Sequence, residues 1–129
     1  MKVLIAEDNQ TIVEGYKKIF PAFNIEIVDT AENGLEVVEK YRLHSKQIDL
    51  VLCDNKMPYM TGLEAARHIL SFDPKAIIVI VSGDPLTESA YKNIGVHAAI
   101  KKPFEIELLV RIINTIVGKT GLKSEAFDE

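Results

Sequence analysis

The chain alternates between short runs of apolar residues and longer segments in which apolar residues recur every three or four positions. Runs of the first kind predict buried strands, and spacing of the second kind predicts amphipathic helices. The predicted strands are residues 3–6, 25–28, 50–53, 77–81 and 98–100. The predicted helices are residues 9–20 with Asn9 as N-cap, 33–44, 63–70, a weaker segment after Pro85, and 104–117.

Five strand–helix alternations predict an α/β fold. Strands that are joined through helices run parallel with right-handed crossovers, so the helices cover both faces of the sheet. At this chain length a doubly wound sheet with strand order 2-1-3-4-5 is the economical arrangement. We expect one domain over residues 1–117. Residues 118–129 contain two glycines and mixed charges, which predicts a C-terminal tail or a linker stub.

Composition narrows the class of protein. The 129 residues are 47% hydrophobic, enough for one core, and the net charge of −4 argues against general nucleic-acid binding. The longest apolar run, residues 76–81, is far shorter than the ~20 residues that cross a membrane. The single cysteine, Cys53, excludes an internal disulfide and fits a reducing compartment. We therefore expect a cytoplasmic protein with no direct nucleic-acid or membrane partner.

Polar side chains follow four of the five predicted strands. In strand order they are Glu7 and Asp8, then Asp54, then Ser82, and finally the pair Lys101 and Lys102. A doubly wound sheet binds ligands beyond the carboxyl ends of its strands, at the switch point between the first and third strands. Asp54 directly ends a buried run, where a carboxylate has little reason to occur for stability alone.

Taken singly, most of these residues have an ordinary structural interpretation. Glu7 or Asp8 is typical of a helix N-cap, Ser82 of a turn and Lys102 of a solvated surface. Taken together they predict chemistry, because converging carboxylates repel one another unless a cation neutralises them, and such hard oxygen ligands suit Mg²⁺. A lysine and a hydroxyl nearby would bind the oxygens of a phosphoryl group. The set therefore predicts an aspartyl-phosphate site with Asp54 as the nucleophile.

At these positions the sequence resembles the receiver domains of two-component response regulators, of the chemotaxis-regulator type. The resemblance extends over residues 1–117 and depends on four motifs: AEDN at 6–9, LCDNKMP at 52–58 with Gly62 after it, VSG at 81–83, and KKPF at 101–104. It implies a flavodoxin-like (βα)5 fold. It also implies a phosphorylation-dependent switch that catalyses only its own phosphorylation and dephosphorylation, and so is a regulator rather than an enzyme.

The resemblance implies roles for the acidic residues and one carbonyl group. Asp54 corresponds to the phosphoacceptor of the family, and Asp8 to a direct Mg²⁺ ligand. Glu7 corresponds to the acidic residue that often acts through a water molecule. The backbone carbonyl of Lys56 corresponds to the third protein ligand of the metal.

The resemblance also assigns the hydroxyl group and the lysine. Ser82 corresponds to the switch hydroxyl that bonds the phosphoryl group. Lys102 corresponds to the family's lysine because it directly precedes Pro103, and this peptide bond is often cis in the family. The implied partners are a histidine kinase or phosphotransfer protein, and a downstream protein or an output domain missing from this sequence.

We expect three further residues to modulate the behaviour of this site. Many members of the family carry Tyr or Phe where this sequence has Ala99, so the usual coupling between the hydroxyl and an aromatic ring lacks its ring. Lys56 and Asp84 lie two residues after the acceptor and the hydroxyl, respectively. We expect that they can pair across the mouth of the site; the alternative is that Asp84 caps a helix begun by Pro85.

The last predicted helix has a wide apolar arc. Its core stripe is Leu109, Ile112, Ile113 and Ile116, and the stripe is widened by Ile106, Val110 and Val117. The arc exceeds the ~100° that one packed face requires. It predicts a surface for a partner or for a homodimer, or else a surface covered by residues 118–129.

Three other functions remain as alternatives. A flavin-binding protein of this fold needs a Gly- and Ser/Thr-rich phosphate loop after the first strand, but residues 7–10 read EDNQ. A phosphatase of the haloacid-dehalogenase type carries a second Asp two residues after its nucleophile, where this chain has Lys56. The third alternative is a receiver-like binding module that works without phosphorylation, which Ala99 keeps open.

Overall fold

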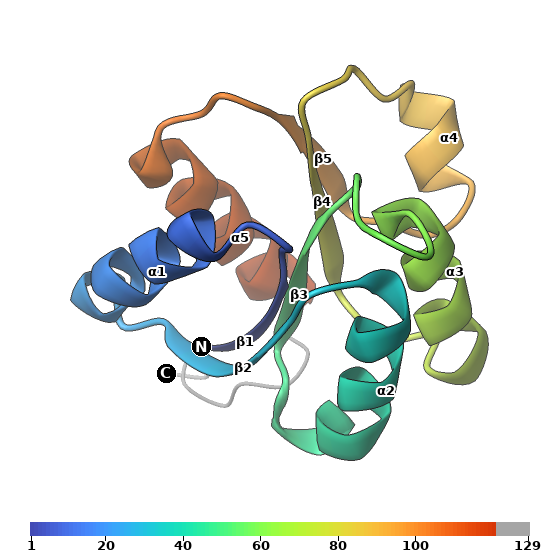
Figure 1. Ribbon diagram of the computed structural model, residues 1–129, viewed down its shortest axis with the longest axis horizontal. Helices are drawn as coiled ribbons and strands as arrows, with labels where there is room; N and C mark the ends of the chain where they lie inside the picture. Colours follow the sequence, from blue (N-terminus) through green and yellow to red (C-terminus); the bar gives the residue numbers. More distant parts are fainter. Residues whose placement is uncertain (121–129) are drawn as a thin grey trace.

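The computed structural model describes the backbone of residues 1–120 and the side chains of residues 1–118. In this range it contains a five-stranded parallel sheet with the order β2-β1-β3-β4-β5 (Figure 1). The strands are β1 (Lys2–Ala6), β2 (Glu26–Ala31), β3 (Leu50–Asp54), β4 (Ile78–Ser82) and β5 (Ala98–Lys101). The α-helices are α1 (Gln10–Ile19), α2 (Gly34–His44), α3 (Gly62–Phe72), α4 (Glu88–Lys92) and α5 (Ile106–Thr120). The predicted doubly wound, flavodoxin-like fold is confirmed.

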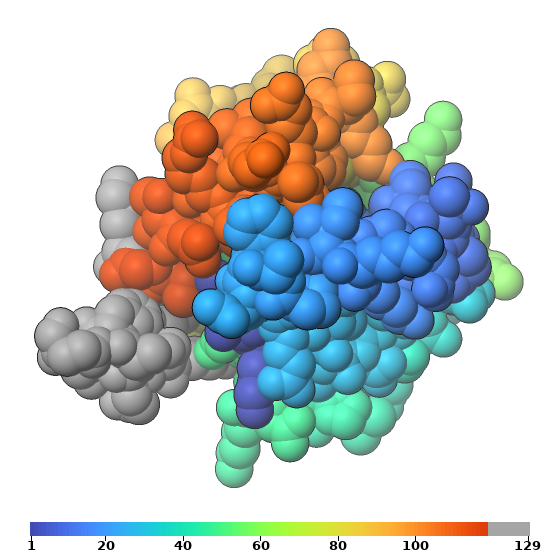
Figure 2. Space-filling model, turned by 90° about the vertical axis from the view of Figure 1, so that its left-hand side faces the viewer, coloured from blue at the N-terminus to red at the C-terminus, as the bar shows by residue number. Residues whose placement is uncertain are grey.

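The sheet separates two hydrophobic cores. On one face, Tyr16 of α1 and Ile113 of α5 belong to the same buried cluster, and Figure 2 shows the two helices side by side over that face. On the other face, Tyr41 of α2 and Ile69 of α3 belong to a second cluster, with α4 at its edge. Every residue of β3 and β4 is buried, which explains why these strands appear as unbroken apolar runs in the sequence.

The edge strand β2 is longer than predicted. It runs to Ala31, so Asp29 and Thr30 lie within the strand, beyond its predicted end at residue 28. An irregularity in its register with β1 occurs between Val3 and Leu4 of β1. An edge strand pairs on one side only, so polar residues can occupy it, and its apolar pattern is correspondingly weak.

The last helix also departs from its predicted bounds. It begins at Ile106 and continues to Thr120, so the predicted boundary at residue 117 falls inside the helix. The rest of the predicted tail, residues 121–129, lies outside the described residues. The residues that widen the arc are covered by the sheet: Val110 and Val117 are buried and Ile106 packs against the same core. No helix in the described part of the chain has both the length and the apolar content to cross a membrane.

Candidate functional site

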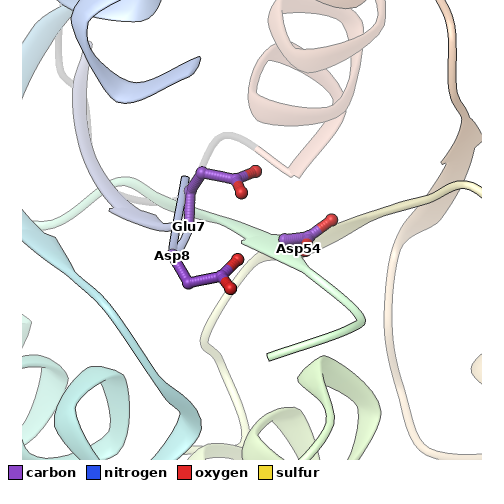
Figure 3. A group of neighbouring side chains, drawn as sticks. All are labelled: Glu7, Asp8 and Asp54. Carbon is purple, nitrogen blue, oxygen red and sulfur yellow. The ribbon is translucent and has the colours of Figure 1, made fainter. Parts of the chain in front are cut away.

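Three carboxylates meet where β1 and β3 end. These strands are neighbours in the sheet, with Ala6 opposite Cys53, so Glu7 and Asp8 follow β1 at the place where Asp54 ends β3. Figure 3 shows the three side chains extending in the same direction. One oxygen from each carboxylate lies within 4.8 Å of the other two. The helix that follows is capped by Asn9, whose side chain accepts the N–H groups of Thr11 and Ile12, so neither acidic residue is its N-cap.

Lys102 supplies the positive charge opposite these carboxylates. Its Nζ atom lies 2.8 Å from Oδ1 of Asp54 and 3.6 Å from Oε1 of Glu7. Its backbone N–H donates to the carbonyl oxygen of Ser82 at 2.8 Å, which holds the segment after β5 against the end of β4. The Lys102–Pro103 peptide bond is cis. Lys101 is exposed, so the structure supports the choice of Lys102 over its neighbour.

Burial shifts the pKa values of charged groups in this cluster. Glu7 is only 3% exposed and Asp54 only 6%. Burial is the largest cause that raises the pKa of Glu7, and the charges of Asp54 and Asp8 raise it further against the opposing effects of the Asn9 N–H and Lys102. Partial burial alone would lower the pKa of Lys102, but its hydrogen bond to Asp54 and the two carboxylate charges raise it above the ordinary value.

The raised pKa of Glu7 predicts a pH effect on the stability of the metal-free protein. A carboxyl group with a pKa above its unfolded value of 4.5 binds more protons when folded, so its ionisation weakens folding as pH rises through that window. Glu7→Gln imitates the protonated form at every pH. We expect the free energy of unfolding of Glu7→Gln, relative to wild type, to increase in EDTA as the pH rises above 4.5. Chemical denaturation measures this difference, and a difference that is independent of pH would contradict the prediction.

Ser82 lies on the next strand, beside a small cavity. Its side chain is buried, and its Oγ accepts the N–H of Asp84 at 3.1 Å. A cavity of about 180 Å³ adjoins it, lined by Ser82, Asp84, Pro85, Leu86, Ala99, Ile100 and Lys101. The small side chain of Ala99 therefore leaves open space next to the hydroxyl group.

The structure changes the interpretation of Asp84. The helix α4 begins at Glu88, and its N-cap is Thr87, whose side chain accepts the N–H of Ala90. The alternative that Asp84 caps this helix is therefore wrong, because three more residues precede the helix than the Pro85 signal indicated. Lys56 and Asp84 are both exposed, and the structure, which describes both residues, records no ion pair between them. Their pairing stays a prediction.

Two residues near the acceptor have roles that only the structure reveals. A Cβ atom at Gly62 would lie 2.5 Å from the carbonyl oxygen of Asp54, so only glycine lets α3 begin this close to the acceptor. Asn55 accepts the N–H of Leu63 on its side-chain oxygen and the N–H of Gly62 on its backbone oxygen. The sequence signal for this role of Asn55 is weak and general: asparagine side chains in loops often bond nearby backbone groups.

The donor set of the cluster fits Mg²⁺. This ion prefers hard oxygen ligands and binds proteins through few carboxylates while keeping several waters. Among the described residues, Lys102 is the only cation that forms an ion pair with any of the three carboxylates, so the cluster retains excess negative charge. A divalent cation held by Glu7, Asp8 and Asp54 would neutralise it.

Comparisons with known proteins agree with this arrangement. The pattern that defines the response regulator receiver domain matches residues 3–114. Chemotaxis protein CheY of Treponema pallidum is 32% identical over 118 residues, which cover 90% of this chain and 82% of that protein. Transcriptional regulatory protein PdtaR of Mycobacterium tuberculosis is 36% identical over 130 residues, which cover 96% of this chain and 62% of that protein.

A solved structure of a related protein has the same fold. A chain in the crystal structure of the CheX–CheY–BeF3–Mg²⁺ complex from Borrelia burgdorferi superposes with a TM-score of 0.82 at 30% identity, over 90% of this chain and 89% of that one. The family match spans most of the sequence, and the fold and the strand-end residues are consistent with it. The chain therefore belongs to the response regulator receiver domain family of two-component signalling proteins.

Proposed function

We propose that this protein is a switch that accepts a phosphoryl group on Asp54 and then changes its partner-binding surface. The observation that carries the proposal is the position of Asp54: its buried carboxylate lies 2.8 Å from the Lys102 ammonium group and within 4.8 Å of two further carboxylates. Burying a third carboxylate beside one lysine costs folding free energy. Phosphoryl transfer uses such carboxylates to hold the divalent cation that neutralises the phosphoryl oxygens.

In the proposed reaction, a carboxylate oxygen of Asp54 attacks the phosphorus atom of the donor. The new P–O bond forms as the P–N bond of a phosphohistidine, or the P–O bond of acetyl phosphate, breaks and leaves its electron pair on the donor. Lys102 already contacts Asp54 and would bind a phosphoryl oxygen, while Ser82 would donate its hydroxyl hydrogen to another. The same residues position the water that later hydrolyses the acyl phosphate, so the protein acts only on itself and remains a regulator.

Mg²⁺ is the proposed cofactor. Asp8 and Asp54 would hold it directly, Glu7 through a water molecule, and the backbone carbonyl of Lys56 would complete the protein ligands. When bound, the ion neutralises the charge that develops on the phosphoryl oxygens. The proposal is supported by the acidic cluster and by related structures whose names include this metal with a beryllium fluoride: the Borrelia burgdorferi complex and response regulator TrrA of Thermotoga maritima at 29% identity.

Switching would start at Ser82. This hydroxyl group now accepts the N–H of Asp84, so its movement toward a phosphoryl group would pull on the segment that leads to α4. The cavity beside Ala99 gives that segment room to move inward without a displaced ring. We propose Lys56 and Asp84, both exposed near the site, as modulators of the hydrolytic water. The two states differ in population only as far as their contacts differ in free energy.

The proposed partners are a histidine kinase or a phosphotransfer protein as donor, and a downstream protein or output domain as reader, in the cytoplasm. A homodimer through α5 stays a prediction. Most of the wide apolar arc of that helix is covered by the sheet, and Leu108, at 42% exposure, is the largest apolar side chain of α5 that is exposed in its described part.

The test is incubation with acetyl phosphate, with and without Mg²⁺, followed by intact mass measurement beside Asp54→Asn. We expect a Mg²⁺-dependent gain of one phosphoryl group in the wild type and none in the variant. Absence of an adduct with acetyl phosphate, a phosphorylated kinase domain and beryllofluoride alike would instead support a binding module that works without phosphorylation. Continuous turnover of a phosphate ester would support the phosphatase alternative.

A further inference from the structure

Asn55, the residue directly after the acceptor, joins three parts of the site through hydrogen bonds. Its backbone N–H donates to the carbonyl oxygen of Val81 on β4 at 2.9 Å. Its backbone oxygen accepts the N–H of Gly62 at 2.8 Å, and its side-chain Oδ1 accepts the N–H of Leu63 at 3.1 Å. Asn55 is half-buried. Its hydrogen bonds link the end of the acceptor strand to the start of α3.

These bonds complete the N-terminus of α3. The first four N–H groups at a helix start lack partners within the helix and must be satisfied otherwise. The capping box satisfies two of them: Thr61 N–H donates to Glu64 Oε1, and Glu64 N–H donates to Thr61 Oγ1. The remaining two belong to Gly62 and Leu63, and both donate to Asn55. The helix start is therefore held by two separate residues, one at each end of the loop 55–61.

The loop between these two anchors is held in an unfavourable backbone conformation. Tyr59, an exposed and bulky residue, has φ of +75°, in the left-handed region that non-glycine residues rarely adopt. Such a conformation persists only where the surroundings determine it. On its far side the loop contacts α2, where a Cβ atom at Gly34 would collide with Met60. At the end of the loop next to the acceptor, Asn55 holds the chain through its hydrogen bonds, and the residue after Asn55 is Lys56.

We propose that Asn55 is a positioning residue for the metal site. Its side-chain bond to Leu63 fixes the direction in which the chain leaves the acceptor strand, and so fixes where the Lys56 carbonyl oxygen lies relative to Asp8 and Asp54. Residues that orient a metal ligand without touching the metal typically change its affinity by about 10–100-fold. This inference rests on the proposed function, because it concerns the carbonyl group assigned there to Mg²⁺.

The test compares Asn55→Ala with Thr61→Ala. Each variant removes one side-chain cap from the same helix, but only the first acts on the residue beside Lys56. We expect similar falls in melting temperature for both variants. In the absence of a phosphodonor, Mg²⁺ titration followed by NMR or calorimetry is expected to show an affinity about tenfold weaker for Asn55→Ala and changed by less than about twofold for Thr61→Ala. At saturating Mg²⁺, acetyl phosphate should phosphorylate Asn55→Ala at a rate close to that of wild type.

Three results would overturn the inference while the proposed function stands. They are equal weakening of Mg²⁺ binding in both variants, unchanged binding in Asn55→Ala, and slow phosphorylation of Asn55→Ala that saturating Mg²⁺ does not restore. If wild type binds no Mg²⁺, the metal part of the proposed function fails and the inference fails with it.

A measurement on the wild type covers the case in which Asn55→Ala does not fold. Coupling between two sites is reciprocal, so bound Mg²⁺ should stabilise the bond that positions its ligand. We expect Mg²⁺ to slow hydrogen exchange of the Leu63 amide more than that of the Glu64 amide, which is held by Thr61. Equal protection of the two amides would overturn the inference.

Discussion

A Gly62→Ala substitution is expected to destabilise the protein by about 3 kcal/mol, the upper part of the range for overpacked sites. The new Cβ atom would lie 2.5 Å from the carbonyl oxygen of Asp54 and 3.0 Å from the Cα atom of Asn55. Both are backbone atoms, so no side-chain rotation relieves the contact, and either α3 or the end of β3 has to move. Chemical denaturation measures the loss. Because the displaced strand end carries Asp54, phosphorylation by acetyl phosphate should fall as well.

The control is Gly15→Ala on α1. Apart from its chain neighbours and the backbone of its own helix, a Cβ atom at Gly15 meets no atom within 4 Å, and the position lies inside a helix. Alanine should therefore stabilise the protein by about 0.5–1 kcal/mol, because it restricts the unfolded chain and favours the helix. If both substitutions changed stability by the same amount, the close approach of α3 to the acceptor would not be the cause.

Lys102→Met is expected to weaken both folding and phosphorylation. The substitution leaves the buried carboxylates of Glu7 and Asp54 without their cation. We expect a loss of about 2 kcal/mol in EDTA, less than for a fully buried pair because the Lys102 side chain is 28% exposed. Mg²⁺ should restore part of this stability by replacing the lost charge. The phosphorylation rate should stay about 100-fold low even at saturating Mg²⁺, because a preorganised charge on the phosphoryl oxygens is missing.

Lys101→Met is the matched control for this change. The side chain of Lys101 is exposed and belongs to the end of β5, one residue away. Its removal should change stability by less than about 0.5 kcal/mol and leave phosphorylation near the wild-type rate. Similar losses in the two variants would contradict the assignment of the functional lysine.

Strands β1, β3, β4 and β5 match their predicted bounds to within one residue at each end. For β3 and β4 the reason is that a run of apolar residues covered on both faces leaves no polar break. The edge strand β2 was predicted too short, because Asp29 is tolerated there: its carboxylate lies 3.3 Å from the Lys40 ammonium group on α2. A contact between two segments leaves no trace in the apolar pattern of either one.

The same division holds at the site. Glu7, Asp8, Asp54, Ser82 and Lys102 could be chosen from the sequence because each ends or follows a strand, and parallel strands bring their carboxyl ends to one edge. The positions of these residues depend on the order of strands and helices along the chain, and that order can be read from the sequence. Asn55 and the N-cap Thr87 could not be assigned in this way, because their roles depend on hydrogen bonds whose partners are set by how the loops fold.

The order of apolar runs, and the polar residues that end them, thus predict the sheet topology and which polar residues lie together at the carboxyl ends of the strands, since parallel strands bring those ends to one edge. The separation of the Lys102 and Asp54 charges, the burial that raises the pKa of Glu7, and the space beside Ala99 required the folded coordinates. These quantities are distances between groups far apart in the chain and the exposed fractions of side chains. They depend on how all the neighbouring side chains pack together.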